Sequence, residues 1–314
     1  MAKFPGVVVV NKEKGYTSHD VVAILKRLYK TKAGHSGTLD PNATGALPVF
    51  IGKATKFVNY FITDDKSYEA EVILGVTTTT GDVTGEVLPV SGIENSQRIG
   101  ERNEENPLAR EISLGKDLSF TVQEIENVLV SFKGDILQTP PMYSAIKIGG
   151  KKLYELARKG ETVERKPRPV SIYDIMLLDY RKNSFTISVD CSKGTYIRSL
   201  CADIGEKLGC GATMGDLIRT KSGQFGIDGA LTISDIRSSS DVWSLTTPIE
   251  RLLPYPAAML KPVAFCNAKN GNPVKLEDLS YVDTTSPKHW LQSDGEIIGL
   301  FSLRNNCLTC EVML

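Results

Sequence analysis

Asp40 is the residue whose surroundings are most typical of a reactive group. It lies in the stretch GHSGTLDPNATGALP, residues 34–48. Four residues there either free or restrict the backbone: Gly34, Gly37, Pro41 and Gly45. The glycines can adopt conformations closed to other residues, and the proline drives the preceding aspartate towards an extended shape. An aspartate held in one direction suits a nucleophile, a metal ligand or a tight turn.

Three further stretches carry candidate residues. KSYEAEVILG, residues 66–75, alternates apolar and polar side chains as a half-buried strand does and contains Tyr68. CSKGTYIRSLCADIGEKLG, residues 191–209, runs into an amphipathic helix near Arg198. TPPMYSAIKIGGKKLYELARKGETVERKPRPV, residues 139–170, is basic and carries two tyrosines around a GG turn. Taken singly, each candidate has an ordinary structural interpretation, in the core, on a helix surface or in an Asp-Pro turn.

Together these four stretches resemble the TruB family, the bacterial tRNA pseudouridine-55 synthases. The resemblance extends to VVNKEKGYTSHDVV near the start and to ALTISDI and NAKNGNPVKL near the end, and so covers most of the 314 residues. It implies an α+β fold of the pseudouridine-synthase type. Such a fold has a mixed, largely antiparallel sheet flanked by helices, followed by a small C-terminal β-rich PUA-like domain.

The resemblance implies that the chain isomerises one uridine in the T loop of tRNA, at position 55, after that base has flipped out of its stack. Asp40 matches the family nucleophile, and the family resemblance leaves open whether attack is on the ribose or on the base ring. No cofactor and no metal are implied. The residues agree with this chemistry, which needs one rigid nucleophile and a dry pocket that holds the released base.

Roles for other residues follow from the same resemblance. Tyr68 matches the tyrosine that stacks on the target uracil and helps to remove the C5 proton. Arg198 matches the arginine that pairs with the catalytic aspartate, and a guanidinium does lower the pKa of a nearby carboxyl. His35 matches the histidine that fills the space left by the flipped base. The remaining matches line the pocket (Lys56, Tyr196 and Leu217) or lie in the basic stretch that would clamp the T arm (Lys147, Lys151 and Lys152).

Charge is balanced overall but unevenly distributed. The chain has 37 Lys/Arg and 37 Asp/Glu, which alone argues against a nucleic-acid partner. Residues 1–66 nevertheless carry ten basic against five acidic residues, a net of +5, and residues 145–170 carry eight against three, again +5. Residues 93–128 carry four against eight, a net of −4. A neutral protein can therefore still present a basic groove to RNA, with solvated helix faces as the alternative interpretation.

Composition places the chain among cytoplasmic proteins. No apolar run of about 18 residues is present, so no membrane span is expected, and the N-terminus lacks the features of a signal peptide. Most of the six cysteines are typical of small buried residues. Cys307 and Cys310 form one CxxC without a second pair, which does not predict a zinc site. We expect a monomer without an obligatory protein partner.

The predicted organisation is a catalytic domain over residues 1–248 and a small RNA-binding module over 249–314. The catalytic domain would contain a T-arm-clamping segment at 131–170 and a long acidic loop at 91–118. Two prolines in residues 249–261 predict a connector between the domains.

Local patterns predict individual elements. Residues 6–10, GVVVV, have the composition and length of a strand. A helix is expected from Thr17 or Ser18 to about Tyr29, and ATKFVNYFI, residues 54–62, is expected to be a short helix. The apolar stripe expected on the first of these helices comprises Val21, Val22, Leu25 and Leu28.

Two other functions use the same scaffold. The chain could be a tRNA-binding or tRNA-folding factor without turnover, or a guide-RNA-dependent pseudouridine synthase. Asp40, Tyr68 and Arg198 together favour an enzyme, because binding alone does not need that trio. The segment 139–170 favours a stand-alone enzyme with its own T-arm clamp.

Overall fold

The computed structural model describes residues 5–89 and 118–314, so the acidic loop predicted at 91–118 lies outside the described residues up to position 117. The chain divides into two compact units. The first comprises Met1–Pro41, Leu47–Thr63 and Asp228–Leu314, and the second Asn42–Ala46 and Asp64–Ile227. The predicted α+β class is confirmed, whereas the domain boundary at residue 248 stays a prediction. Among the described residues no helix has the length and apolar character needed to cross a bilayer.

The first unit begins with a strand, a helix and a second strand. It contains β1 (Gly6–Lys12), α1 (Ser18–Tyr29), β2 (Ala33–His35), the later part of β3 (Thr44–Ile51) and the 3-10 helix η1 (Gly52–Tyr60). After the second unit the chain returns through α5 (Ile233–Ser238), η2 (Val242–Leu245), β14 (Thr247–Pro248) and α6 (Ile249–Leu252). The strand order here is β14-β1-β3, and β2 pairs with β3.

The first helix begins where its cap predicts. Thr17 accepts a hydrogen bond from the backbone N–H of Asp20 at 3.1 Å, and the Asp20 carboxylate accepts one from the Thr17 N–H at 2.8 Å. This reciprocal capping box satisfies two donors that a helix start leaves unpaired. Val21 and Leu25 are buried as predicted, but Val22 and Leu28 are only half-buried. The buried stripe continues instead through Tyr29, whose ring packs edge-on against Trp243.

The short helix predicted at 54–62 forms two residues earlier and as a 3-10 helix, η1. It begins at Gly52, whose φ of +64° ends the extended backbone of β3. Thr55 Oγ1 donates to the carbonyl oxygen of Gly52 at 2.8 Å, and the Phe61 N–H donates to the carbonyl of Val58 at 3.0 Å. These contacts between residues i and i+3 favour the tighter helix.

The second unit is built on a long sheet. Its strands are the first residues of β3, then β4 (Lys66–Leu74), β7 (Gly134–Gln138), β10 (Arg168–Arg181), β11 (Ser184–Cys191), β12 (Ala212–Ser222) and β13 (Phe225–Gly226). The order is β3-β12-β4-β11-β10-β7, with β13 on β12. The β3–β12 pair is parallel and the other pairs in the order are antiparallel. This agrees with the mixed, largely antiparallel sheet predicted from the resemblance.

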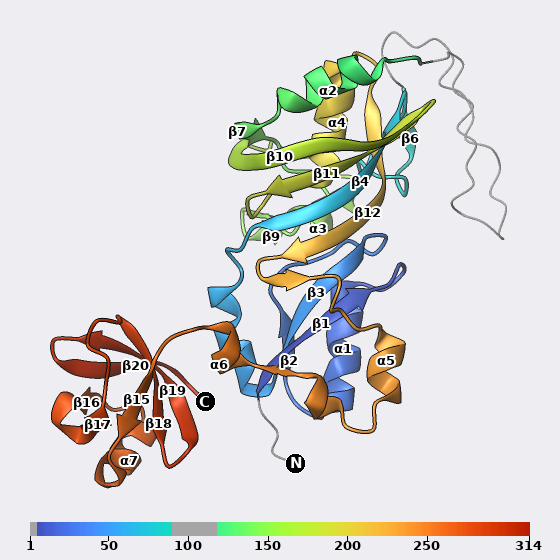
Figure 1. Ribbon diagram of the computed structural model, residues 1–314. Helices are drawn as coiled ribbons and strands as arrows, with labels where there is room; N and C mark the ends of the chain where they lie inside the picture. The colour runs from blue at the N-terminus through green and yellow to red at the C-terminus, as the bar shows by residue number, and fades with distance from the viewer. Residues whose placement is uncertain (1–4, 90–117) are drawn as a thin grey trace. The chain divides into compact units, whose positions relative to one another are not determined.

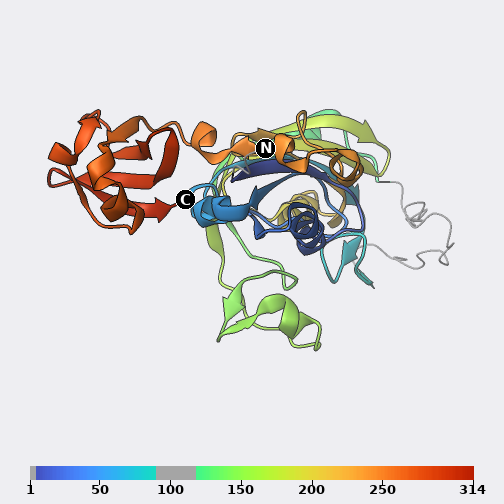
Figure 2. The same cartoon turned by 90° about the horizontal axis from the view of Figure 1, so that it is seen from below.

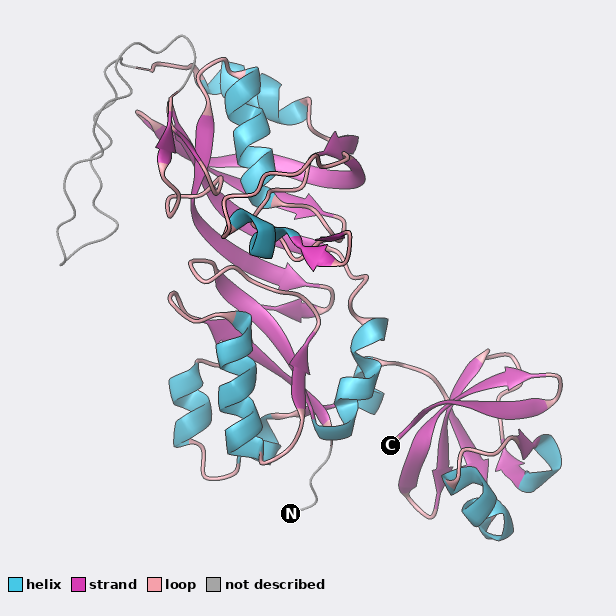
Figure 3. Cartoon of the chain, turned by 180° about the vertical axis from the view of Figure 1, so that it is seen from behind, coloured by secondary structure: helices cyan, strands magenta, loops and turns pink. Residues whose placement is uncertain are grey.

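Helices cover one face of this sheet, as Figure 3 shows. They are α2 (Val122–Val130), which packs on β10, and α4 (Ile197–Lys207), which packs on β12. Two small hairpins complete the unit: β5 (Thr77–Thr78) with β6 (Val87–Leu88), and β8 (Lys147–Ile148) with β9 (Lys151–Lys152), which leads into α3 (Leu153–Ala157). The segment with β8, β9 and α3 projects away from the sheet in Figure 2.

The C-terminal residues form a small β-rich domain, as predicted (Figure 1). Its strands are β15 (Ala257–Leu260), β16 (Val274–Lys275), β17 (Leu279–Tyr281), β18 (Lys288–Ser293), β19 (Glu296–Arg304) and β20 (Cys307–Met313), in the order β16-β20-β19-β18-β15-β17. Between them lie η3 (Pro262–Ala264), α7 (Phe265–Lys269) and η4 (Leu276–Asp278). The connector expected at 249–261 thus contains a helical turn, α6, and the strand β15.

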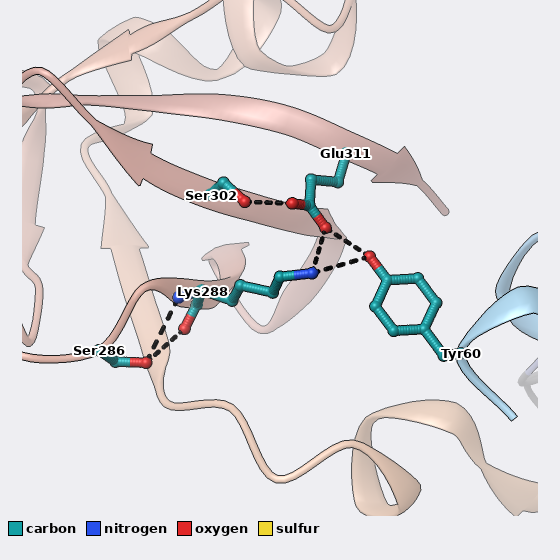
Figure 4. A network of polar contacts seen from close by, with 5 residues as sticks. All are labelled: Tyr60, Ser286, Lys288, Ser302 and Glu311. Carbon is teal, nitrogen blue, oxygen red and sulfur yellow. Dashed lines mark hydrogen bonds and ion pairs between the residues drawn. The ribbon is translucent and has the colours of Figure 1, made fainter. Parts of the chain in front are cut away.

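A polar network joins η1 to this C-terminal sheet within the first unit (Figure 4). The Glu311 carboxylate accepts hydrogen bonds from the hydroxyl groups of Tyr60 and Ser302. It also forms an ion pair with Lys288, whose Nζ lies 2.7 Å away. The Lys288 ammonium also lies 4.7 Å from the centre of the Tyr60 ring. Burial alone would raise the pKa of Glu311, but these three donors lower it to about 2.

Candidate active site

The loop that carries Asp40 is fixed on both sides of the aspartate. On one side the buried Ser18 hydroxyl accepts from the Leu39 N–H at 2.8 Å and donates to the Leu39 carbonyl at 3.0 Å. On the other side the Pro41 carbonyl accepts from the Gly15 N–H at 3.0 Å and from Lys12 Nζ at 3.1 Å. The half-buried Asp40 therefore has both neighbours held by side chains and backbone from β1, α1 and the turn between them.

Lys12 is fully buried, although a lysine seldom is. Its ammonium group has three carbonyl partners, those of Glu13, Tyr16 and Pro41, at 3.0, 2.7 and 3.1 Å. Such a set of acceptors compensates much of the desolvation of the charge. Ser18 was expected only at the start of the first helix, and no local pattern marks Lys12 or Ser18 as a support of the Asp40 loop.

The glycines of the loop differ in what they contribute. Gly45 has a φ of +105°, and a Cβ there would lie 2.3 Å from the carbonyl oxygen of Arg219. Only glycine allows β3 to approach β12 this closely. Gly34, by contrast, would accept a Cβ, whose nearest neighbour would be a Thr55 methyl at 3.9 Å. The prediction that Gly34 supplies a conformation closed to other residues is therefore wrong.

Tyr68 lies on the buried, helix-covered face of β4 and is 8 % exposed. Its register partners are Val189 on β11 and Arg219 on β12. Arg219 is 1 % exposed, donates from Nε to the Ala46 carbonyl at 2.8 Å and forms a side-chain hydrogen bond with Tyr68. Burial lowers the pKa of Arg219, and its interactions with Tyr68 oppose that shift.

A second buried cation lies two residues before Tyr68 on the same face. Lys66 is 8 % exposed, and its ammonium donates to the carbonyl of Asp64. Burial and then the charge of Arg219 lower the pKa of Lys66. Two buried cations, Arg219 and Lys66, thus lie close to Tyr68, with the carboxylates of Asp64 and Asp65 near Lys66.

Arg198 is the second residue of α4 and is 6 % exposed, so it is not a surface helix arginine. Its Nη1 donates to the carbonyl of Thr80 at 3.1 Å and its Nη2 to the carbonyl of Tyr143 at 2.8 Å. The guanidinium thereby joins α4 to the β5–β6 turn and to the start of the basic segment. Its predicted ion pair with Asp40 stays a prediction.

The start of α4 is itself clamped. The side chain of Gln138, 2 % exposed, accepts from the Tyr196 N–H at 2.7 Å and donates to the Tyr196 carbonyl at 3.0 Å. A helix start leaves backbone N–H groups without partners, and here Gln138 takes the place of a capping side chain. This sets the position of Arg198 two residues later.

The other predicted pocket residues are spread over several elements. Leu217 is 7 % exposed on β12, opposite Ala70. His35 ends β2, and its ring lies 5.8 Å from that of His19, edge to face. Lys56 lies on η1, where its ammonium donates to the carbonyl of Met313 at 2.8 Å.

The predicted clamp forms a small hairpin with an exposed basic surface. Gly149 and Gly150, at φ of +57° and +83°, make the turn between β8 and β9. Lys147 and Lys151 are exposed, and Lys152 is half-buried. The Lys152 ammonium and the Arg158 guanidinium each lie 5.4 Å from the centre of the Tyr154 ring. The tyrosine therefore holds two cations beside the hairpin.

Comparison with known proteins identifies the family. Residues 26–108 and 97–197 match the model described as TruB family pseudouridylate synthase (N terminal domain), and residues 198–264 match the tRNA pseudouridylate synthase B C-terminal domain. The chain belongs to the TruB family of pseudouridine synthases. It is therefore an isomerase, as predicted.

Relatives of the family match over most of the chain. A tRNA pseudouridine synthase B of Clostridium tetani is 40% identical over 299 residues, which cover 94% of both chains. That of Geobacillus kaustophilus is 46% identical and covers 79% of this chain and 82% of its own.

Among solved structures, a Cbf5-Nop10-Gar1 complex contains a similar fold, with a TM-score of 0.65 and 24% identity. The match covers 99% of this chain and 84% of that one.

Proposed function

We propose that the chain converts uridine to pseudouridine at position 55 in the T loop of tRNA, with Asp40 as the nucleophile. The observation that carries this proposal is the anchoring of Leu39 and Pro41 on either side of Asp40, in a chain of the TruB family. Relatives that are named tRNA pseudouridine synthase B support tRNA as the substrate.

The chemistry places three demands on the protein. The target base must leave its stack, at a cost of a few kcal/mol, before any residue can reach it. The nucleophile must then be held in one direction, and the fixed loop of Asp40 meets that demand. The released uracil must be kept in place while it rotates, which is the part we assign to Tyr68, Leu217 and Tyr196.

Recognition of the RNA is assigned to the basic hairpin. Exposed lysines at positions 147 and 151 suit contacts with phosphates. Arg198 donates to the carbonyl of Tyr143, at the start of this segment, so the proposed clamp is bonded to the helix that carries a proposed active-site residue.

The test uses the purified full-length chain and unmodified tRNA transcript with no other component. Pseudouridine is then mapped along the product at single-nucleotide resolution. We expect modification at position 55 alone, and also on an isolated T stem-loop, because such proteins read RNA shape and loops.

Other outcomes identify other functions. Binding without product would identify a tRNA-binding or tRNA-folding factor. Product only after addition of a guide RNA would identify a guide-dependent enzyme, and product at another uridine would refute the assigned position.

A further inference from the structure

Arg219 is a buried cation in the catalytic sheet, and the mechanism proposed above gives it no role. It is 1 % exposed, among the most deeply buried large side chains that the structure describes. A guanidinium retains its charge in proteins and can only donate hydrogen bonds. Its burial is costly unless its donors find partners, so the partners indicate what the residue is for.

One of those partners lies on the strand after the Asp40 loop, and another is Tyr68, itself a proposed active-site residue. Nε donates to the carbonyl of Ala46, on the strand that follows the Asp40 loop, at 2.8 Å. The side chain also hydrogen-bonds Tyr68, directly across the β12–β4 ladder. The backbone of Arg219 is itself fixed, because it packs against Gly45, where no Cβ would fit.

The direction of the bond to Tyr68 has a chemical consequence. Because the guanidinium only donates, the Tyr68 oxygen must accept, which orients the hydroxyl group. A neighbouring positive charge also favours the phenolate over the phenol, and Lys66 adds a second buried cation to the same face. We propose that Arg219 is a positioning residue for the isomerisation, which holds the Tyr68 oxygen ready to accept a proton.

This inference rests on the proposed function and deepens it. In the isomerisation the bond from ribose to N1 breaks and a bond from ribose to C5 forms, so C5 then carries both the sugar and its original hydrogen. Removal of that proton returns its electron pair to the C5–C6 double bond. The phenolate form of Tyr68 accepts this proton and becomes a phenol, and N1 takes up a proton from solvent. When the Tyr68 phenol later releases its proton to solvent, one proton has moved overall from C5 to N1.

The test measures single-turnover rates on T-arm RNA that carries either hydrogen or deuterium at C5 of the target uridine. Arg219→Met removes the charge and Arg219→Lys keeps it. Lys221→Met is the matched control, because Lys221 lies two residues further along β12 with an exposed side chain. Affinity for the RNA and thermal unfolding are measured for each variant.

We expect Arg219→Met to lower the rate about 100-fold, as loss of acid–base assistance does, with affinity and folding retained. Arg219→Lys should recover part of this loss. In both variants proton removal becomes rate-limiting, so a primary isotope effect appears that the wild type and Lys221→Met lack. In the Tyr68→Phe background, Arg219→Met should add little, because the two residues act on one step.

A folded Arg219→Met variant with the wild-type rate would overturn the inference. So would a rate loss without an isotope effect, which marks a merely structural role. If Arg219→Met does not fold, the isotope effect in Arg219→Lys decides in the same way. An inactive wild-type protein would instead refute the proposed function.

Discussion

At the scale of single residues, the reactivity assigned to Asp40 depends on groups that hold its neighbours. Ser18 fixes Leu39, and Lys12 fixes Pro41. The aspartate itself therefore has little freedom to relax when its side chain is changed. Substitutions at Asp40 should therefore lower the reaction rate alone. Substitutions at the residues that support its loop should lower both the reaction rate and the free energy of unfolding.

Replacing the proposed nucleophile should abolish turnover and spare binding. Asp40→Asn or Asp40→Ala should reduce the single-turnover rate by about 10⁴-fold or more, a loss typical of a missing nucleophile. Affinity for tRNA should stay near that of the wild type. Asp235→Asn, in the exposed capping box of α5, is the control and should keep full activity. Substantial turnover by Asp40→Ala would remove this residue from the mechanism.

Removing Ser18, which anchors the Asp40 loop, should lower the single-turnover rate less than replacing Asp40 does. Ser18→Ala leaves the buried N–H and carbonyl of Leu39 without their partner, which costs about 1–3 kcal/mol of folding free energy. A shifted Asp40 should lower the rate by up to about 100-fold, since a displacement of one ångström has effects of that size. Urea unfolding and single-turnover rates measure the two effects. Ser238→Ala, at the end of α5, is the control, and a fully active Ser18→Ala would show that the loop keeps its shape without this anchor.

Arg198 should tolerate neither loss of charge nor loss of shape. Its two carbonyl partners, on Thr80 and Tyr143, require a fork that lysine lacks. We expect Arg198→Lys to lose about 100-fold in rate and Arg198→Ala to lose more. The alanine variant should also need a higher pH for activity, because a carboxylate without a nearby guanidinium ionises later. An unshifted pH profile would leave Arg198 as a link between α4 and its loops, without a partner in Asp40.

At the scale of elements, the sequence predicted well those features that depend on residues close together in the chain. The helix α1 has its cap three residues from the side chain that it bonds, and β4 alternates over nine consecutive residues. Contacts between distant positions escaped prediction. Arg219 bonds Ala46 across 173 positions, and Gln138 clamps Tyr196 across 58. No local pattern distinguishes these two residues from ordinary surface or strand positions.

The same limit explains the errors at element boundaries. Prolines at 249–261 predicted a connector, but β15 forms there because β18, about 30 residues later, supplies its partner. A strand is stabilised by its neighbours, which a single segment does not reveal. Tyr68 was predicted on its strand, and the alternation of β4 places Lys66 on the same face. Arg219 could not be placed beside Tyr68, because the register of β12 on β4 joins positions that are distant in the sequence.

The basic hairpin should dominate the salt dependence of RNA binding. Replacing both Lys151 and Lys152 with alanine should weaken binding and make the slope of log K against log salt shallower by about 1 to 2, the value for one or two lost phosphate contacts. The rate at saturating enzyme should fall far less than the affinity. Arg181→Ala with Lys182→Ala, at the β10–β11 turn, is the control. An unchanged slope would mean that these hairpin lysines are exposed to solvent and do not contact phosphates.

At the scale of the whole molecule, charge counts by segment overstate what reaches the surface. Residues 1–66 have a net charge of +5, yet Lys12 and Lys66 are buried and bond backbone carbonyls. The second segment of net +5, residues 145–170, does expose Lys147 and Lys151. Two of the ten basic residues in the first segment are therefore structural, and the hairpin is the better candidate for contact with phosphates.

The joint between η1 and the C-terminal sheet should depend on pH through Glu311. Its pKa is about 2 in the folded chain against an ordinary value of 4.5. A lowered carboxyl pKa stabilises the fold above the ordinary value, and this contribution disappears as pH falls from there towards 2. Glu311→Gln should therefore cost about 1–2 kcal/mol at neutral pH, given its partial exposure, and almost nothing near the acid limit.

Urea unfolding followed by tryptophan fluorescence measures this difference, because Trp290 is buried in the same sheet, 5.4 Å from the Phe57 ring of η1. Glu296→Gln is the matched control: its partner Lys269 is exposed and the pair is 3.3 Å apart, so its loss should be small at any pH. An equal loss for Glu311→Gln at both pH values would mean that packing rather than charge holds the joint. No loss at neutral pH would mean that Lys288 and Tyr60 bind η1 to the sheet without the carboxylate.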